Sequence, residues 1–219
     1  MRRPLGLLFD MDGVLCRNMP AHIEAWRLFF RRYGVTFTLH DFLANTMGRP
    51  THEVLGYYFK RTVPPSEART LAAIKESLYR RIYRPNLRAA NGLRRFLENA
   101  QAQGYRIGLG TGSKQDNVSF IIDGLDLRGY FDAIVDGSMV AKGKPDPETY
   151  RLLARALEIR PKDCVVFEDS LLGEEAAHRA GMHVVAITTS HRPDEFKHAK
   201  ITARDFSRLS PTQAVELLC

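Results

Sequence analysis

Cysteine is scarce in this sequence of 219 residues: there are three, and no two of them form a CxxC pair. Such scattered thiols exclude a disulfide framework and a zinc knuckle, and they favour a reducing, cytoplasmic location. Long apolar runs are missing too, since none reaches the roughly 18 residues that a membrane-spanning helix needs. The short run before Asp10 ends too early for a signal peptide. We therefore expect a soluble cytoplasmic protein with no membrane partner.

Low-complexity tracts and internal repeats are also lacking, which excludes repeat architectures. The composition is 44% hydrophobic and 26% charged, close to the average of folded domains. A chain of this length predicts one large domain, or one with a smaller attachment.

Acidic residues are few in one part of the chain. Residues 17–88 hold 13 Lys or Arg against 5 Asp or Glu, whereas the remainder holds 19 against 20. The whole net charge of +7 therefore comes from one contiguous segment. This asymmetry predicts two bodies with different electrostatics.

Outside that segment, short apolar runs alternate with stretches of helical periodicity. The runs cover residues 5–9, 105–109, 132–136, 164–167 and 183–187. The helical faces carry Leu93, Phe96, Leu97 and Ala100 in one stretch and Tyr150, Leu153 and Leu157 in another, and Ser210-Pro211 marks a later helix start. Such alternation predicts an α/β fold with a Rossmann-like parallel sheet.

Residues 17–88 follow a different pattern, with no strand-like run. One helical stripe comprises Ile23, Trp26, Phe30 and Tyr33, a second comprises Leu71, Ile74, Leu78 and Ile82, and Pro64-Pro65 and Pro85 interrupt the segment. We predict a helical domain over 17–88, inserted into a catalytic core formed by 1–16 and 89–219.

Carboxylates follow the first apolar run at once. Asp10 and Asp12 precede Gly13, which lets the chain turn, so both side chains are expected near the carboxyl end of the first strand. Open α/β sheets bind ligands at that edge. A carboxylate can attack phosphorus, but an anion attacking a phosphate dianion needs a cation to screen the repulsion. The pattern predicts a phosphoryl-transfer site that contains a metal ion, a lysine or both.

Further polar residues follow other predicted strands. Residues 110–114, Gly-Thr-Gly-Ser-Lys, offer a hydroxyl and open backbone N–H groups for phosphate oxygens. Lys144 stands before Pro145, and Glu168-Asp169 end the run 164–167. Mg²⁺ prefers oxygen ligands and binds through one or two carboxylates plus substrate phosphate, which Asp10 and Asp169 can provide. We therefore expect Mg²⁺ as the cofactor.

These motifs, in this order and each after an apolar run, resemble the four motifs of the haloacid dehalogenase superfamily. They are Asp10-Met11-Asp12-Gly13-Val14-Leu15, Thr111, Lys144-Pro145 and Glu168-Asp169. The insertion resembles the superfamily's helical cap, in the group that contains β-phosphoglucomutase and phosphoglycolate phosphatase. The resemblance covers nearly the whole chain and implies a cap that closes over the parallel core.

The resemblance implies a role for each matching residue. Asp10 would be the nucleophile and a Mg²⁺ ligand. Asp12 would protonate the leaving oxygen, later activate water, and lend its backbone carbonyl to the metal. Thr111 would bind the transferring phosphoryl group and Lys144 would neutralise it. Asp169 would be a metal ligand, and Glu168 a ligand directly or through water.

For the other candidate substrate-binding residues, a purely structural or surface role is the alternative. Gly112 offers a backbone N–H, while Ser113 and Lys114 match positions that contact a second phosphate in the mutase but could serve only as helix N-cap and surface charge. His22 matches a cap histidine, although a helix histidine is more often structural. Arg49 could bind an anionic leaving group or be a surface residue.

The implied function is a Mg²⁺-dependent phosphatase that hydrolyses a small anionic phosphorylated metabolite, such as a sugar phosphate, through an aspartyl-phosphate. A phosphomutase is the first alternative, but the mutase's cap arginine, which follows its Gly-x-Ser, has no counterpart here: Gly48-Arg49-Pro50-Thr51 has threonine in that place. An inorganic pyrophosphatase is the second. A protein whose basic insertion binds nucleic acid or an acidic partner is the third. We expect no nucleic-acid partner, because the basic residues follow no recognisable nucleic-acid motif.

Overall fold

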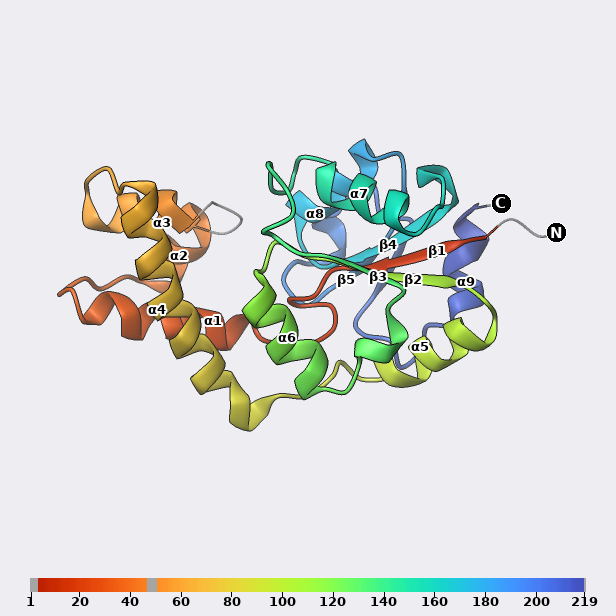
Figure 1. Ribbon diagram of the computed structural model, residues 1–219, viewed down its shortest axis with the longest axis horizontal. Helices are drawn as coiled ribbons and strands as arrows, with labels where there is room; N and C mark the ends of the chain where they lie inside the picture. Colours follow the sequence, from red (N-terminus) through yellow and green to blue (C-terminus); the bar gives the residue numbers. More distant parts are fainter. Residues whose placement is uncertain (1–3, 47–50, 219) are drawn as a thin grey trace. The chain divides into compact units, whose positions relative to one another are not determined.

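The computed structural model describes residues 4–46 and 51–218. The chain divides into two compact units (Figure 1). The first, which we call the core unit, comprises Met1–Arg17 and Leu87–Cys219, and the second, the cap unit, comprises Asn18–Asn86. Among the described helices, none combines the length and the apolar character that crossing a bilayer requires.

A parallel sheet of six strands forms the middle of the core unit. Its strands are β1 (Gly6–Phe9), β2 (Arg106–Gly110), β3 (Ala133–Val135), β4 (Cys164–Glu168), β5 (His183–Ile187) and β6 (Ile201–Ala203), in the order β3-β2-β1-β4-β5-β6. The predicted α/β fold and its five predicted strands are confirmed. The edge strand β6 was not predicted, because three residues with one strong apolar side chain give no periodic signal.

The strand order reverses beside β1. Phe9, at the end of β1, is paired with Leu109 of β2 on one side and with Phe167 of β4 on the other. The chain moves outward through β2 and β3, then returns to the other side of β1 with β4. Ligands of open α/β sheets bind where the order reverses, so the residues that follow β1 and β4 occupy the expected position.

Helices cover both faces of this sheet (Figure 1). One face carries α7 (Glu148–Ala156) and α8 (Leu171–Arg179), and the other carries α5 (Leu93–Ala102), α6 (Gln115–Gly124) and α9 (Pro211–Val215). The predicted apolar faces of α5 and α7 are buried as expected. The helix predicted at Ser210-Pro211 begins there, with the Ser210 side chain accepting a hydrogen bond from Gln213 N.

Aromatic rings fill the space beneath the centre of the sheet. The rings of Phe9 and Phe167 stack with centroids 4.5 Å apart, and Phe96 and Phe206 contact both of them. All four side chains are essentially fully buried. Removing one such ring typically costs about 3–5 kcal/mol. The cluster therefore fixes the ends of β1 and β4 relative to one another.

The core unit also holds both ends of the insertion. Leu15 O accepts a hydrogen bond of 2.8 Å from Ala90 N, so the chain that leaves β1 and the chain that returns toward α5 are joined there. Gly92, which caps α5 with φ +76, packs against the Phe206 backbone so closely that a Cβ would lie 2.5 Å from Phe206 C. The segment that returns from the insertion is thereby fixed to the end of the core unit.

Every element described in the cap unit is helical. The helices are α1 (Met19–Arg31), α2 (Leu39–Thr46), α3 (Thr51–Phe59) and α4 (Pro65–Tyr83), followed by the 3₁₀ turn Arg84–Asn86. Phe30 is fully buried among the rings of Trp26, Tyr58 and Phe59. This unit is therefore stabilised by aromatic packing rather than by a sheet.

The predicted stripes of α1 and α4 were only partly correct. Tyr33 is 47% exposed because α1 ends at Arg31, and Ile74 and Ile82 are half-buried. The buried face of α4 consists of Ala68, Leu71, Lys75, Leu78, Tyr79 and Tyr83. This face was not recognised from the hydrophobic pattern, because it includes a lysine and two tyrosines.

Candidate active site

Asp10 directly follows β1 and is 7% exposed. Its backbone N–H donates to Phe167 O at 3.0 Å, which continues the pairing of β1 with β4 by one residue. Gly13 then turns the chain with φ +82, and a Cβ there would lie 1.8 Å from Asp169 Oδ2. Both the positive φ and the close approach require glycine. The turn therefore brings the carboxylates after β1 beside those after β4.

Lys144 connects the two strand ends. Its Nζ donates to Asp10 Oδ1 and to Glu168 Oε1, both at 2.5 Å, and to Gly110 O at 3.3 Å. Its side chain is 13% exposed. Lys142, two residues before it, is exposed, and its backbone N–H donates to Glu148 Oε2 at 2.8 Å. The structure thus brings Lys144, rather than Lys142, to the predicted nucleophile.

Both carboxylate oxygens of the fully buried Glu168 accept hydrogen bonds. Oε1 accepts from Lys144 and from the Tyr150 hydroxyl at 2.8 Å. Oε2 accepts from the backbone N–H groups of Asp169 and Ser170 and from Ser170 Oγ, at 3.0 to 3.1 Å. At Gly173 a Cβ would collide with Oε1. Glu168 is therefore held rigidly, in a position that orients Lys144.

Asp169 is fixed from the neighbouring strand. Its Oδ2 accepts hydrogen bonds from Thr189 Oγ1 at 3.2 Å and from Ser190 Oγ, and these two residues come just after β5. Thr189 Oγ1 also donates to Gly13 O at 2.7 Å. One hydroxyl thus connects the loop after β1 with the carboxylate after β4.

The charges of this cluster are unbalanced. Burial raises the pKa of Asp10 well above its usual range despite Lys144, and burial together with Glu168 raises the pKa of Asp169 to about 7. Burial also acts against ionisation of Glu168, but Lys144 and the hydrogen bonds lower its pKa on balance. Burial opposes the charge of Lys144 as well, yet Asp10 and Glu168 raise its pKa well above the ordinary value. Three carboxylates thus share one lysine.

This donor set fits a hard divalent cation. Asp10, Glu168 and Asp169 each offer a carboxylate oxygen, and these atoms lie within 4.8 Å of one another. Oxygen-only donors and excess negative charge are what Mg²⁺ selects. Since both oxygens of Glu168 already accept hydrogen bonds, Asp10 and Asp169 are the better placed of the three.

The loop after β2 presents the predicted phosphate-binding residues. Thr111 is 1% exposed, and its Oγ1 accepts a hydrogen bond from Ser113 N at 3.1 Å. Gly112 and Lys114 are exposed. Lys114 is the N-cap residue of α6, without a side-chain cap hydrogen bond, so Ser113 is not the cap. Ser113 Oγ instead donates to Asp12 Oδ2 at 2.6 Å.

In the cap unit, His22 lies against a buried lysine. The His22 ring stacks on Tyr79 with centroids 3.7 Å apart, and its Nδ1 is 2.9 Å from Lys75 Nζ. Lys75 is 4% exposed, donates to Glu76 at 2.8 Å and lies over the Trp26 ring. Arg49, the other predicted cap residue, lies outside the described residues.

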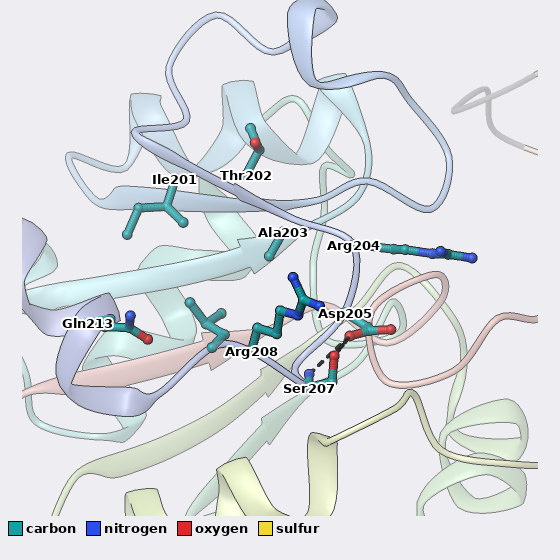
Figure 2. A pocket seen from close by; sticks show the side chains of 9 residues that line it. Ile201, Thr202, Ala203, Arg204, Asp205, Ser207, Arg208 and Gln213 are labelled. Carbon is teal, nitrogen blue, oxygen red and sulfur yellow. Dashed lines mark hydrogen bonds between the residues drawn. The ribbon is translucent and has the colours of Figure 1, made fainter.

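A sizeable surface cavity of about 630 Å³ lies away from this cluster, beside β6 (Figure 2). Arg204, Arg208, Thr202 and Gln213 are among its lining residues, and Asp205 accepts hydrogen bonds from Ser207 N and Oγ. None of the residues lining this cavity belongs to the predicted site. A sizeable cavity is therefore present outside the predicted site.

Several polar residues with structural contacts, in either unit, were not predicted from the sequence. Thr189 and Ser190 follow β5, so the strand-end rule that selected Glu168-Asp169 could have found them. Tyr150 was assigned to an apolar helix face, where its hydroxyl gave no signal, and Lys75 was hidden among the apolar residues of α4. Each of these side chains makes a hydrogen bond to another polar side chain and belongs to none of the sequence motifs.

This chain is similar to known proteins over most of its length. A family profile described as Haloacid dehalogenase-like hydrolase matches residues 7–187. A phosphorylated carbohydrates phosphatase from Thermotoga maritima is 34% identical over 80% of this chain and 81% of its own length. Fructose-1-phosphate phosphatase YqaB from Escherichia coli is 32% identical over 84% of this chain and 97% of its own. A crystal structure of a HAD hydrolase from Entamoeba histolytica has the same fold, with a TM-score of 0.92, 23% identity and coverage of 98% and 99% of the two chains.

Proposed function

The chain belongs to the haloacid dehalogenase-like hydrolases, as its motifs predicted, and from this premise we propose that it is a Mg²⁺-dependent phosphatase of a small phosphorylated metabolite. The observation that carries the proposal is the convergence of Asp10, Lys144 and Asp169 where the strand order reverses. The two relatives named above act, by their names, on phosphorylated carbohydrates, which supports a sugar phosphate as the substrate class.

The residues that would hold the metal are Asp10 and Asp169, through their carboxylates, and Asp12, through its backbone carbonyl. When bound, Mg²⁺ supplies positive charge that screens the repulsion between a carboxylate nucleophile and a phosphate dianion. Glu168 acts indirectly, because its hydrogen bonds hold Lys144 against Asp10.

The reaction proceeds in two displacements at phosphorus. An Asp10 carboxylate oxygen attacks, the bond from phosphorus to the ester oxygen breaks, and the leaving oxygen takes a proton from Asp12. Water then attacks the aspartyl-phosphate, the Asp10 oxygen leaves with its electron pair, and a proton of that water passes to Asp12. Lys144 donates to Asp10 Oδ1, which leaves Oδ2 as the attacking oxygen.

Phosphoryl oxygens are bound by residues of two strand ends. The Thr111 hydroxyl and the Gly112 backbone N–H donate to them from the loop after β2. Lys144 neutralises charge that develops on them, and Tyr150 keeps the lysine in place through Glu168 and through its ring, 4.9 Å from Lys144 Nζ. Donors fixed in advance contribute most to such catalysis, because they need no reorganisation during the reaction.

The basic segment 17–88 attracts an anionic substrate. Steering of this kind weakens with ionic strength, since the Debye length falls from about 10 Å at 0.1 M salt to about 3 Å at 1 M. A steep decline of kcat/KM with salt is expected, and a flat response would exclude steering.

The decisive experiment measures phosphate release from a panel of sugar phosphates, phosphoglycolate, nucleotides and pyrophosphate. Wild type with Mg²⁺ is compared with wild type in EDTA and with Asp10→Asn, which removes the nucleophile at nearly constant size. Release that needs both Mg²⁺ and Asp10 supports the proposal and ranks the substrates. Equal release by wild type and Asp10→Asn would overturn it, and an isomerised sugar phosphate in place of free phosphate would identify a mutase.

A further inference from the structure

Ser113 makes a contact that substrate binding does not explain. Its hydroxyl donates to Asp12 Oδ2 at 2.6 Å, and both side chains are half-buried. The two residues come from adjacent strand ends, Asp12 from the loop after β1 and Ser113 from the loop after β2. A hydrogen bond this short restricts the rotation of the Asp12 side chain in both of its protonation states.

The backbone of Ser113 is itself held on both sides. Its N–H donates to Thr111 Oγ1 at 3.1 Å, and its carbonyl accepts from Gly137 N at 2.9 Å. Gly137 lies so close to this loop that a Cβ would come 2.1 Å from Gly112 O. The Asp136 side chain in turn accepts hydrogen bonds from Ser138 N and Oγ, which fixes the turn after β3. The Ser113 hydroxyl is thus presented to Asp12 by a preorganised loop.

We propose that Ser113 is a positioning residue that acts through Asp12 and aims it at the leaving oxygen. The inference rests on the proposed function, in which Asp12 protonates that oxygen. Because the hydroxyl donates to Oδ2, the transferable proton of Asp12 belongs on Oδ1. The bond from phosphorus to the ester oxygen breaks as the Asp10 bond forms, and the Oδ1 proton passes to the alcohol that leaves.

This role differs from phosphate binding in its dependence on the leaving group. A sugar alkoxide is a strong base and needs the proton, whereas p-nitrophenolate is a weak base that leaves without it. The ratio kcat/KM reports the steps up to the first phosphoryl transfer, so it isolates protonation from the later attack of water. A residue that only binds the phosphoryl group would affect both kinds of ester equally.

The test compares Ser113→Ala, Ser113→Thr and Ser119→Ala. Ser119 lies in α6, and among the described residues its hydroxyl accepts hydrogen bonds from Gln115 and Arg128 only, which makes it a matched control. The substrates are p-nitrophenyl phosphate and the sugar phosphate that wild type hydrolyses fastest. Thermal unfolding of each variant is measured in parallel.

We expect Ser113→Ala to lower kcat/KM for the sugar phosphate about tenfold and for p-nitrophenyl phosphate less than about twofold. Ser113→Thr, which keeps the hydroxyl, should retain most of the activity, and Ser119→Ala should match wild type. In an Asp12→Ala background, Ser113→Ala should have no further effect, because residues that act through one another are not additive.

Equal losses on both esters, or a change in KM alone, would show that Ser113 binds substrate and would overturn the proposal. Unchanged kcat/KM on both esters would overturn it as well. If wild type releases no more phosphate than Asp10→Asn from either ester, the proposed function itself fails. An active wild type with an unselective Ser113→Ala would refute only the role of Ser113.

Discussion

The core unit and the cap unit bury polar groups in opposite ways. In the core unit, Asp10, Glu168 and Asp169 are buried together around one lysine at the ends of neighbouring strands. In the cap unit, Lys75 is buried among Trp26, Tyr79 and His22, on the faces of helices. The residues outside 17–88 are nearly balanced in charge, whereas those within 17–88 are strongly basic.

This difference indicates how the two units divide the work. Chemistry that needs several carboxylates at fixed distances is built on a sheet, whose strand ends are held by backbone pairing and by stacked phenylalanines. Under the proposed function, the helical cap unit contributes positive charge that attracts the substrate rather than reacting groups. The two buried lysines, Lys144 and Lys75, provide a matched pair for testing this division.

The largest effect is expected for Lys144→Met. Loss of the cation leaves Asp10 and Glu168 with uncompensated negative charge and removes a donor to the phosphoryl group, so kcat should fall by about 10³-fold. Steady-state kinetics on the best substrate measures it. Lys142→Met, two residues away at an exposed position, serves as the control. A loss below about tenfold in Lys144→Met would place the critical charge elsewhere.

Phe30→Ala should destabilise the cap unit by about 3 kcal/mol, because it removes a fully buried ring. Trp26, the single tryptophan of the chain, lies in this unit, so its fluorescence reports unfolding of the cap unit. We expect the Trp26 fluorescence of Phe30→Ala to change at a lower denaturant concentration than that of wild type, while amide exchange of β1 and β4 stays slow. Parallel losses of both signals would mean that the two units unfold as one.

Lys75→Met should have a smaller effect on catalysis than its counterpart in the core unit. We expect kcat/KM to fall through a higher KM, with kcat changed less than about twofold, because Lys75 is one of the basic residues to which the proposed function attributes attraction of the anionic substrate. Trp26 fluorescence checks that the variant is folded. A fall in kcat comparable to that of Lys144→Met would contradict the division between the units.

The smallest effect concerns acid stability of the cap unit. Tyr57 and Tyr58 donate to the Asp41 carboxylate at 2.7 and 2.8 Å and lower its pKa. The stabilisation is therefore present above the unfolded pKa, near 3.9, and is lost as the pH falls through the lower folded value. The midpoint of the Trp26 transition should decline below about pH 4. For Asp41→Asn this midpoint should decline less steeply with falling pH than for wild type. Identical pH dependence in the two proteins would exclude a contribution from Asp41.

Much of the fold was predictable, because buried parallel strands are short apolar runs that end at polar residues. The runs that became β1, β2, β4 and β5 are bounded in this way, and their order gave the correct sheet class. The face of α4 was not predictable. A cation–π contact with Trp26 stabilises Lys75, and stacking on His22 stabilises Tyr79, in buried positions that a hydrophobic pattern assigns to apolar side chains.

At the candidate site, the sequence located the chemical groups but not their partners. Asp10, Lys144 and Asp169 were selected by their places after strands, and the structure brings them together. The pairing of Glu168 with Tyr150 and of Ser113 with Asp12 depends on side-chain directions across strands far apart in sequence. Such contacts depend on how distant segments pack in three dimensions, so the local sequence does not predict them.

The position of β1 has a consequence for how the chain is assembled. Gly6 pairs with residues 100 and 158 positions later, and the whole insertion lies between the first strand and its earliest partner. During synthesis, β1 therefore has no partner strand until the insertion and then β2 have been synthesised. An insertion that folds early converts a long loose loop into a short tether, which lowers the entropy lost when β1 meets β2. A compact insertion thus lowers the entropic cost of forming the sheet that it interrupts.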